Sequence, residues 1–317
     1  MLRPGDTRVS SKARWRIISY LNCAQATLGT VAEGLGLDCR EALKAACPLE
    51  GGAVSTGSTC GVVSGGCLAL ALAGEGRRRG GETAPGLYRA LLEYISWFER
   101  EYGSTICRER CGVKVATPAG FANYLVTGKF VSRCVAHAGP AASYLVALAG
   151  RLPEAETAGE SAPARGYCAG EVVAGIREDT GKGSPLLETV SAALDGGVGF
   201  SGGLCGALAG ALLPVGSTWG IDPAAAGFAG TLGAFLRGHA NMYRGLERPE
   251  QWSVGGRLVR AFKREFGSLE CATITGRRFE GAAGLAEYME GREMCGAIKD
   301  WCRRRTSELI TSALQGK

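Results

Sequence analysis

Eight of the thirteen cysteines recur as four pairs, with one member of each pair in either half of the chain. The first two pairs are each 145 residues apart, the third 164 and the fourth 161: Cys23 and Cys168, Cys60 and Cys205, Cys107 and Cys271, and Cys134 and Cys295. Thiolates ligate iron–sulfur clusters and zinc, and they are the nucleophiles of dithiol–disulfide exchange. The pattern indicates a duplicated thiol site with four sulfur donors in each half.

Glycines recur in step with the first two cysteine pairs. The matched positions are Gly51, Gly52, Gly57 and Gly61 in the first half and Gly196, Gly197, Gly202 and Gly206 in the second. Each set forms a loop, G-G-x-x-x-x-G-x-x-C-G, that leads into the second cysteine. Glycine lets the backbone approach a bulky inorganic group and expose its N–H donors to it. We therefore expect these eight glycines to contact a bound cofactor.

The second cysteine of each half follows this loop and is expected to open a helix. Free N–H groups and the positive end of the helix dipole favour a thiolate at such a position. The sequence therefore predicts a lowered pKa for Cys60 and Cys205.

The later pairs differ in how well the neighbouring sequence supports them. Cys107 and Cys271 each end the segment F-x-R-E-aromatic-G-S-x-x-C, whereas the match between Cys134 and Cys295 depends mainly on position. The other cysteines have no evident partner in the repeat, and free cysteines often only fill space in a core. We expect that plain role for Cys39, Cys47, Cys67, Cys111 and Cys302.

Helical periodicity dominates the sequence, and the best strand pattern, at residues 113–115, is very short. Helices are predicted at 15–34, 39–47, 60–73, 86–102 and 134–149, and then at 168–178, 185–194, 204–213, 223–243, 250–266 and 284–314, the last with a break near Gly291. The larger offset of the third cysteine pair places an insertion in the second half, near 216–248.

The sequence thus predicts an all-α protein of two homologous helical units in tandem. The units span residues 11–150 and 167–317, and a linker with two prolines and no apolar periodicity, 151–166, joins them. Fusing two copies of a self-associating unit preserves their interface, so we expect pseudo-two-fold symmetry.

Composition excludes several classes of protein. The net charge of +6 comes largely from arginine runs without interleaved aromatic residues, which argues against nucleic-acid binding. The uncharged stretch 196–221 contains nine glycines, and its apolar part is too short for a membrane span. An odd number of cysteines and an N-terminus without an apolar signal region predict a cytoplasmic protein without a disulfide framework.

Other motifs of known chemistry are absent from the sequence. There are two histidines, His137 and His239, and no C-x-x-C-H, so c-type haem attachment is excluded. No P-loop, G-x-S-x-G or H-E-x-x-H occurs. Whether the chain is an enzyme stays open at this point.

At its repeated cysteines the chain resembles the C_GCAxxG_C_C family of redox-active proteins. Residues 205–210 match C-G-A-x-x-G in full, and residues 60–65 differ in carrying Val62 where the pattern has alanine. Residues 22–26 look like the opening of the family pattern, and the F-x-x-x-aromatic-G-S-x-x-C segments resemble its third cysteine region. The resemblance implies a helical protein with four shared cysteines and a redox role. In the related split-Soret cytochromes such cysteines are thought to hold an iron–sulfur cluster.

We therefore expect each unit to bind an iron–sulfur cluster, 2Fe–2S or 4Fe–4S, for electron transfer or redox sensing, with a protein redox partner. The expected ligands are Cys23, Cys60, Cys107 and Cys134 in the first unit and Cys168, Cys205, Cys271 and Cys295 in the second. A homo-oligomer is compatible with this interpretation.

Two alternatives stay open. A dithiol–disulfide oxidoreductase would use Cys60 or Cys205 as the attacking thiol and Cys23 or Cys168 as the resolving thiol. A structural zinc or thiol-packing protein is the other alternative. Gaps of 37, 47 and 27 residues between the first unit's cysteines leave no paired C-x₂₋₄-C knuckle of the kind that zinc sites usually contain.

Overall fold

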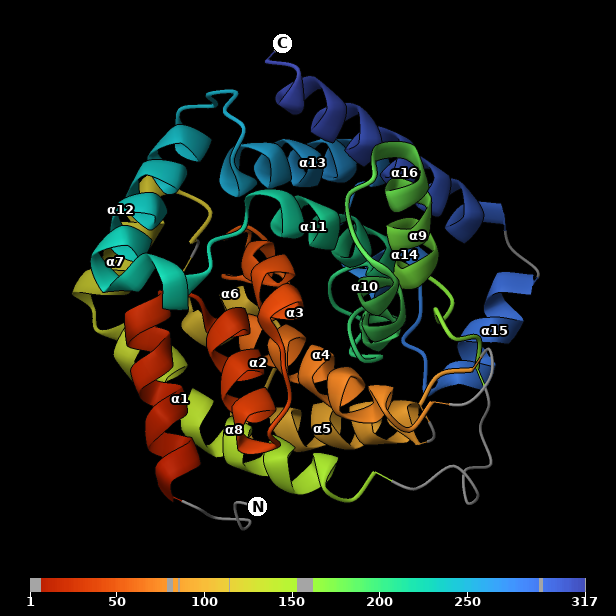
Figure 1. Cartoon of the computed structure of the whole chain (residues 1–317), viewed down its shortest axis with the longest axis horizontal. Helices are drawn as coiled ribbons and strands as arrows, with labels where there is room; N and C mark the ends of the chain where they lie inside the picture. Colours follow the sequence, from red (N-terminus) through yellow and green to blue (C-terminus); the bar gives the residue numbers. More distant parts are fainter. Residues whose placement is uncertain are drawn as a thin grey trace.

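The computed structural model describes residues 7–78, 82–84, 86–113, 115–152, 162–290 and 293–316, and these residues form helices joined by loops (Figure 1). The first unit contains α1 (Thr7–Tyr20), α2 (Cys23–Gly34), α3 (Arg40–Ala45), the 3₁₀ helix η1 (Cys47–Leu49), α4 (Gly61–Glu75), α5 (Leu87–Tyr102), α6 (Cys107–Cys111), α7 (Pro118–Val126), the π-helix η2 (Phe130–Val135) and α8 (Ala136–Ala149). No β-strand occurs within the described residues, where isolated bridges are the only β-type pairing. The expected all-α class is confirmed.

The second unit repeats this order. It contains α9 (Ala169–Thr180), α10 (Pro185–Val190), the 3₁₀ helix η3 (Ser191–Leu194), α11 (Gly206–Trp219), α12 (Pro223–Tyr243), α13 (Gln251–Phe266), α14 (Cys271–Thr275), α15 (Ala282–Glu290) and α16 (Glu293–Leu314). Helices α2 to α6 correspond in order to α9, α10, α11, α13 and α14, α7 corresponds to α15, and η2 with α8 corresponds to α16. Two helices break the repeat: α1 has no counterpart among the described residues of the second unit, and α12 is the predicted insertion.

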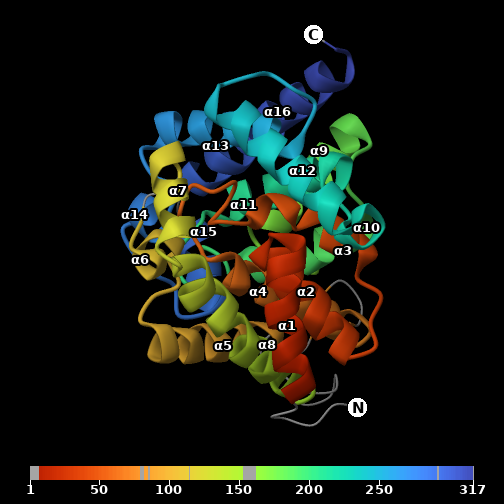
Figure 2. The ribbon, with the colours of Figure 1, turned by 90° about the vertical axis from the view of Figure 1, so that its left-hand side faces the viewer.

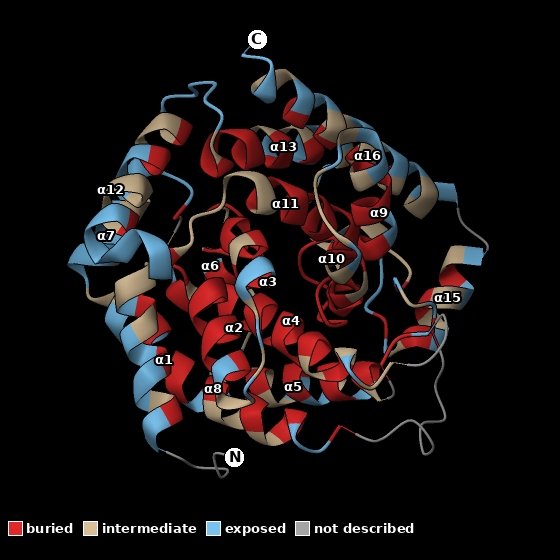
Figure 3. Ribbon diagram, viewed as in Figure 1, coloured by how far each residue is buried: buried red, intermediate tan, exposed pale blue. Residues whose placement is uncertain are grey.

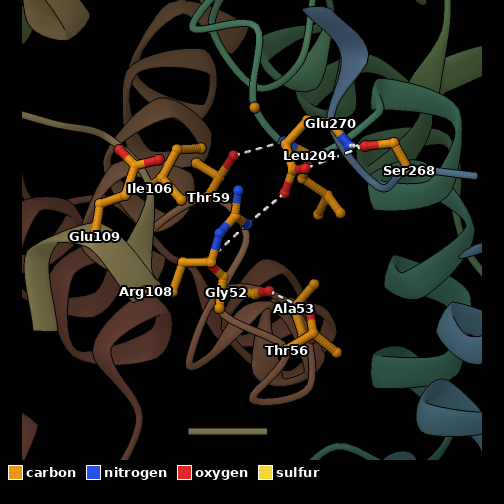
Figure 4. Close-up of polar contacts among 12 residues, drawn as sticks. Gly52, Ala53, Thr56, Thr59, Ile106, Arg108, Glu109, Leu204, Ser268 and Glu270 are labelled. Carbon is orange, nitrogen blue, oxygen red and sulfur yellow. Dashed lines mark hydrogen bonds and ion pairs between the residues drawn. The ribbon is translucent and has the colours of Figure 1, made fainter. Parts of the chain in front are cut away.

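The two units pack together reciprocally. Helix α4 packs on η3 and α10 of the second unit, and its counterpart α11 packs on η1 and α3 of the first. The backbone N–H of Leu204 donates a 2.7 Å hydrogen bond to the hydroxyl of Thr59, 145 residues earlier, so two equivalent residues touch at the interface (Figure 4). A contact between equivalent residues lies on a symmetry axis, which is the geometry of the expected pseudo-two-fold arrangement.

An ion pair reinforces this interface beside the axis. Arg108 Nη1 lies 2.7 Å from a carboxylate oxygen of Glu270, which also accepts a hydrogen bond from Ser268 (Figure 4). Matched backbone bridges join Thr59 to Ile106 in the first unit and Leu204 to Glu270 in the second. The loop before each second cysteine is therefore fixed to the segment before each third cysteine in the same way.

Glycines let the central helices approach closely. A Cβ on Gly65 would overlap the carbonyl oxygen of Ala24, and one on Gly210 would lie 2.6 Å from the carbonyl oxygen of Ala169. Nearly every residue of α4 and α11 is buried, as Figure 3 shows for the middle of the molecule. The second glycine of each C-G-x-x-x-G motif thus sets the distance between α2 and α4 in the first unit and between α9 and α11 in the second.

The structure corrects the helix predicted at 15–34 and agrees with the interpretation of the uncharged stretch 196–221. The helix expected at 15–34 is two helices, because Leu21 has a φ of 50° and the side chain of Asn22 caps α2 by accepting from the N–H of Gln25. The uncharged stretch 196–221 is a loop followed by α11, and within the described part of the chain no helix combines the length and apolar character of a membrane span.

Some expectations fall on residues outside the described ones. They are the middle of the linker, residues 153–161, and the break near Gly291, which lies between the end of α15 and the start of α16. The strand pattern at 113–115 includes the undescribed Lys114, and neither Val113 nor Val115 lies in a strand.

Candidate functional site

The four predicted cysteines of the first unit line one cavity. Its volume is about 140 Å³, and Cys23, Cys60, Cys107 and Cys134 all form part of its wall. The rest of the wall is mostly apolar and comes from α1, α7, η2 and α12 and from the loop residues Leu21, Glu50, Gly51, Ser55 and Val115. The fold therefore brings together four thiols that are spread over more than 100 residues of sequence.

Each of these cysteines lies at an end of a helix or in an irregular helix. Cys23 begins α2, Cys60 directly precedes α4, and Cys107 begins α6, while Cys134 lies in the π-helix η2. The N–H of Cys60 donates to the carbonyl of Thr105 at 2.8 Å, and the N–H of Cys107 donates to that of Ser58 at 2.7 Å. These two bonds hold the second and third cysteines side by side.

The second unit repeats that backbone arrangement. The N–H of Cys205 donates to the carbonyl of Leu269 at 2.8 Å, and the N–H of Cys271 donates to that of Gly203 at 2.6 Å. Burial, and then the charges of Asp195 and of the unit's other three cysteines, raise the pKa of Cys168 well above its ordinary value. The four predicted cysteines of the second unit therefore also lie near one another.

The glycine loop has an unusual backbone. Five successive residues, 51–55, have positive φ angles, and so do their counterparts 196–200. Residues other than glycine rarely adopt this left-handed region, and its recurrence in both units shows that the loop conformation is specified by the fold. Gly51 lines the cavity, and its N–H donates to the thiol of Cys23.

The other predicted glycines serve close packing. A Cβ on Gly61 would overlap the sulfur of Cys23, and one on Gly206 would lie 3.1 Å from Cβ of Cys168. A Cβ on Gly197 would lie 2.8 Å from Cβ of Cys271. The remaining four press on loop and helix residues of their own unit: Gly52 on Ser58, Gly57 on Arg108, Gly196 on Phe200 and Gly202 on Ala272.

A buried arginine contacts the first unit's thiols. Arg110 Nη1 donates to the sulfur of Cys60 at 2.7 Å, and the guanidinium lies 4.7 Å from the ring centre of Phe98. Burial lowers the pKa of Arg110, but the charges of the surrounding cysteines raise it by more, so this arginine is held as a cation. Its Nε has no hydrogen-bond partner. The corresponding residue of the second unit is Ile274.

A fifth cysteine joins the first unit's site, contrary to the space-filling role expected from the sequence. Cys111 Sγ lies 3.9 Å from Cys107 Sγ, and Cys111 also contacts Cys134. The hydroxyl of Tyr124 lies 2.7 Å from Cys134 Sγ. A C-x-x-x-C spacing puts both thiols on one face of a helix, which is the signal that could have revealed Cys111. Its counterpart in the second unit is Thr275.

The expectation of a lowered pKa at the second cysteine is wrong for Cys205. Burial raises the pKa of its thiol to about 11, although the N–H groups of Ala207 and Leu208 donate to the sulfur and act in the opposite direction. The helix terminus supplies the predicted hydrogen bonds, but desolvation of the charged form outweighs them.

A buried polar group borders the first unit's cavity. The Ser55 hydroxyl lies 3.0 Å from Glu50 Oε1 and 3.0 Å from Nε2 of His239, whose Nδ1 lies 2.9 Å from the carbonyl oxygen of Phe235. Burial raises the pKa of Glu50 to about 7 and lowers the pKa of His239 to about 4. His239 comes from α12, so the second unit's insertion completes the first unit's site.

The counterpart of Glu50 is Asp195, which has a different role. Its carboxylate accepts hydrogen bonds from the N–H groups of Tyr167 and Cys168 at 2.7 and 3.0 Å and from the hydroxyl of Tyr88 at 2.9 Å. Asp195 therefore anchors the first turn of α9, whereas Asn22 caps α2 in the first unit.

The thiols surround a space in the first unit and do not converge on a single point. Among the described residues, no three histidine, cysteine, aspartate or glutamate side chains are close enough together to hold one metal ion. All thirteen cysteines are free thiols.

One protein family matches the chain twice, over residues 21–147 and 166–310, which together are more than half of its length. Each match begins just before the first cysteine of a unit and extends beyond the fourth. No curated protein and no solved structure matches the chain significantly. The chain therefore belongs to the family described as "Putative redox-active protein (C_GCAxxG_C_C)", and it contains that family's unit in tandem.

Proposed function

We propose that each unit binds an iron–sulfur cluster through its four repeated cysteines and that the chain transfers electrons or senses redox state. The carrying observation is the single cavity lined by Cys23, Cys60, Cys107 and Cys134. Four thiol donors around a space are the donor set of both [2Fe–2S] and [4Fe–4S] clusters.

The chemistry of the donors and the room between them both fit a cluster. Thiolates are the usual ligands of iron–sulfur clusters, and the surrounding apolar wall limits the access of water. A bound cluster would supply one-electron reduction and oxidation. The chain's own contribution would be to position the sulfurs, to donate hydrogen bonds to them from Arg110 and Gly51, and to balance their negative charge.

A single zinc ion fits the first unit less well. Four thiolates bound tetrahedrally at 2.3 Å from one ion lie about 3.8 Å from one another and leave no space between them. The four thiols instead line a cavity of about 140 Å³, and no described group of three candidate ligands closes on one ion. A cluster of several atoms uses that space.

A dithiol–disulfide activity is supported less by the predicted thiols. Such an activity needs a thiol with a lowered pKa, and burial raises the pKa of Cys205 to about 11. The close thiols Cys107 and Cys111 are a different pair from the one expected, and their sulfurs are 3.9 Å apart.

Anaerobic purification tests the proposal directly. The expected result is brown protein with visible charge-transfer absorption and with iron and acid-labile sulfide that both scale with two clusters per chain. Protein that stays colourless after anaerobic reconstitution with iron and sulfide would overturn the proposal. Zinc bound at one or two ions per chain, with unfolding on its removal, would establish the structural alternative.

A further inference from the structure

Four elements around the first unit's cavity, α1, α7, η2 and α12, share an unusual surface. Figure 2 shows α1, α7 and α12 on the same side of the molecule. Within the bounds of α1, α7, η2 and α12 there are six arginine or lysine residues and no aspartate or glutamate. We call the exposed surface of these four elements the basic apolar face.

The same face carries most of the exposed large apolar side chains. Of the ten exposed large hydrophobic residues among the described ones, seven lie here: Trp15, Ile18, Leu125, Val126, Val131, Phe228 and Leu236. Soluble proteins rarely expose so many large apolar side chains together unless the surface binds something. The side chains are spread over elements that are far apart in sequence, so the surface is a product of the fold.

This face is also the way into the cysteine site. Leu125 of α7 and Leu236 of α12 both line the cavity, and they are 50% and 54% exposed. Rings join the two helices, since Phe121 lies 5.8 Å from Phe235 between ring centres. A molecule bound on α7 and α12 would therefore lie directly over the first unit's thiols.

Two acidic groups at the edges of the face make structural contacts there, and exposed Glu109 lies beside α7, where it lines a hollow with Gly120 and Asn123. Glu33 of α2 pairs with Lys12 and Arg16 at the edge of α1. Asp222 caps α12 by accepting from the N–H groups of Ala224 and Ala225. Arg133 of η2 and Arg237 of α12 are exposed. The second unit differs, because α15, the counterpart of α7, contains Glu287 and Glu290 and no cation.

We propose that the basic apolar face docks an acidic electron-carrier protein, which exchanges electrons with the thiol-bound centre of the first unit. This inference rests on the proposed redox function. Opposite charge would steer the carrier to the face, and the apolar side chains would hold it over the cavity. Small, short-lived interfaces are usual for electron-transfer partners.

A second copy of this chain is the less suitable occupant. A two-fold contact would place the same face against itself and bring cations against cations. An anionic membrane surface would match the charge, but it would not use the opening of the cavity between α7 and α12. Both occupants remain outcomes of the test.

The test compares two variants of equal net charge. R133E/R237E reverses two exposed cations of the basic apolar face, and R89E/R304E reverses two exposed cations on α5 and α16. A plant-type [2Fe–2S] ferredoxin of net negative charge is the probe. Its binding to the full-length chain, as purified, is measured by fluorescence anisotropy at several ionic strengths, and its rate of electron exchange by stopped flow.

The expected result is an R133E/R237E dissociation constant raised about tenfold at low ionic strength, against a change of less than about twofold for R89E/R304E. Binding by the unaltered chain should weaken as salt is added. Equal effects of the two variants, or no binding at all, would overturn the inference.

Further measurements separate the competing explanations. Sedimentation with anionic-lipid vesicles that depends on Arg133 and Arg237, without ferredoxin binding, would assign the face to a membrane. A dimer of the chain that R133E/R237E dissociates would assign it to self-association. Ferredoxin binding through this face to a chain that contains no iron and exchanges no electrons would refute the proposed cluster but leave the docking surface standing.

Discussion

The two units share a framework but differ in what surrounds their thiols. In both, a glycine loop of left-handed residues leads to the second cysteine, and matched backbone bonds join that cysteine to the segment of the third. The first unit adds Arg110 and Cys111 where the second has Ile274 and Thr275. The comparison teaches that the shared residues build the thiol site, whereas its electrostatic surroundings have diverged.

The covering of the two sites differs as well. Helix α12 is part of the second unit in sequence, yet it is bonded to the first unit. Within α12, His239 is hydrogen-bonded to Ser55 and Tyr243 to the carbonyl of Val115. Just before α12, the carbonyl of Ile221 accepts from the side chain of Gln25. Because α1 and α12 cover the first site, and neither has a counterpart among the described residues of the other unit, two units of common origin present different surfaces. We therefore expect the two sites to have different redox properties and different access.

The largest expected effect is the loss of one cluster at a time. Cys60→Ser removes a proposed ligand of the first unit, and Cys205→Ser removes its counterpart in the second. Each variant should retain about half of the iron and sulfide of the unaltered protein, and the double variant almost none, because thiolate ligands hold the cluster. Iron and sulfide assays on anaerobic protein give the answer.

Cys39→Ser is the matched control, since Cys39 lies outside both sites at the start of α3. It should leave the iron content unchanged. Full iron content in Cys60→Ser would remove Cys60 from the proposed ligand set.

Substitution of an equivalent packing glycine should destabilise the two units by the same amount. Gly65→Ala and Gly210→Ala each place a Cβ against a backbone carbonyl oxygen of the facing helix, so each should cost about 3 kcal/mol in the free energy of unfolding. Urea unfolding of the metal-free chain measures this cost. Gly76→Ala is the control, because a Cβ there meets nothing within 4 Å. A large cost in one unit and none in the other would break the structural equivalence.

The buried Glu50 should make stability depend on pH. Its pKa rises from 4.5 to about 7 on folding, so between these values the folded chain keeps a proton that the unfolded chain releases. This contribution to stability is present below pH 4.5 and is lost as the pH rises through 7, at a cost of about 3 kcal/mol. Glu50→Gln removes the cost and should be more stable than the unaltered chain at pH 8.

His239 acts in the opposite direction. Its pKa falls from 6.5 to about 4 on folding, so its contribution is lost as the pH falls from 6.5 to 4. In the Glu50→Gln variant, the free energy of unfolding should therefore rise as the pH increases from 4 to 6.5. In the unaltered chain, the titration of Glu50 opposes this rise and lowers the free energy of unfolding toward pH 7. Urea midpoints of the metal-free chain across this range provide the check, and identical pH profiles of the two proteins would contradict the assignment.

The smallest expected effect concerns the potential of the first unit's centre. A cation that donates to a ligand sulfur stabilises the more negative, reduced state. Arg110→Ile, which installs the second unit's residue, should lower the midpoint potential of the first unit's cluster by about 60 mV, equivalent to tenfold in a one-electron equilibrium.

Redox titration followed by electron paramagnetic resonance resolves the two centres. Arg110→Lys keeps the charge and should recover part of the shift. An unchanged potential in Arg110→Ile, with the cluster still bound, would show that the arginine serves packing alone.

The duplication, the all-α class, the insertion and the recurrence of eight cysteines can all be read from the sequence alone, because each leaves a local or periodic pattern. A repeat shows only what both copies share. It therefore could not reveal Arg110 or His239, which lack an equivalent in the other unit, and only the C-x-x-x-C spacing from Cys107 indicates Cys111.

Which of these residues lie next to one another depends on the packing of the whole chain. Burial raises the pKa of Cys205, where the sequence predicts a lowered one. Desolvation depends on everything packed around the thiol and not on the helix terminus alone. Helix α12 packs against the first unit, so His239 lies next to Glu50, which is 189 residues earlier in the chain. Local sequence fixes helices and their caps, but contacts between distant segments arise only when the whole chain packs.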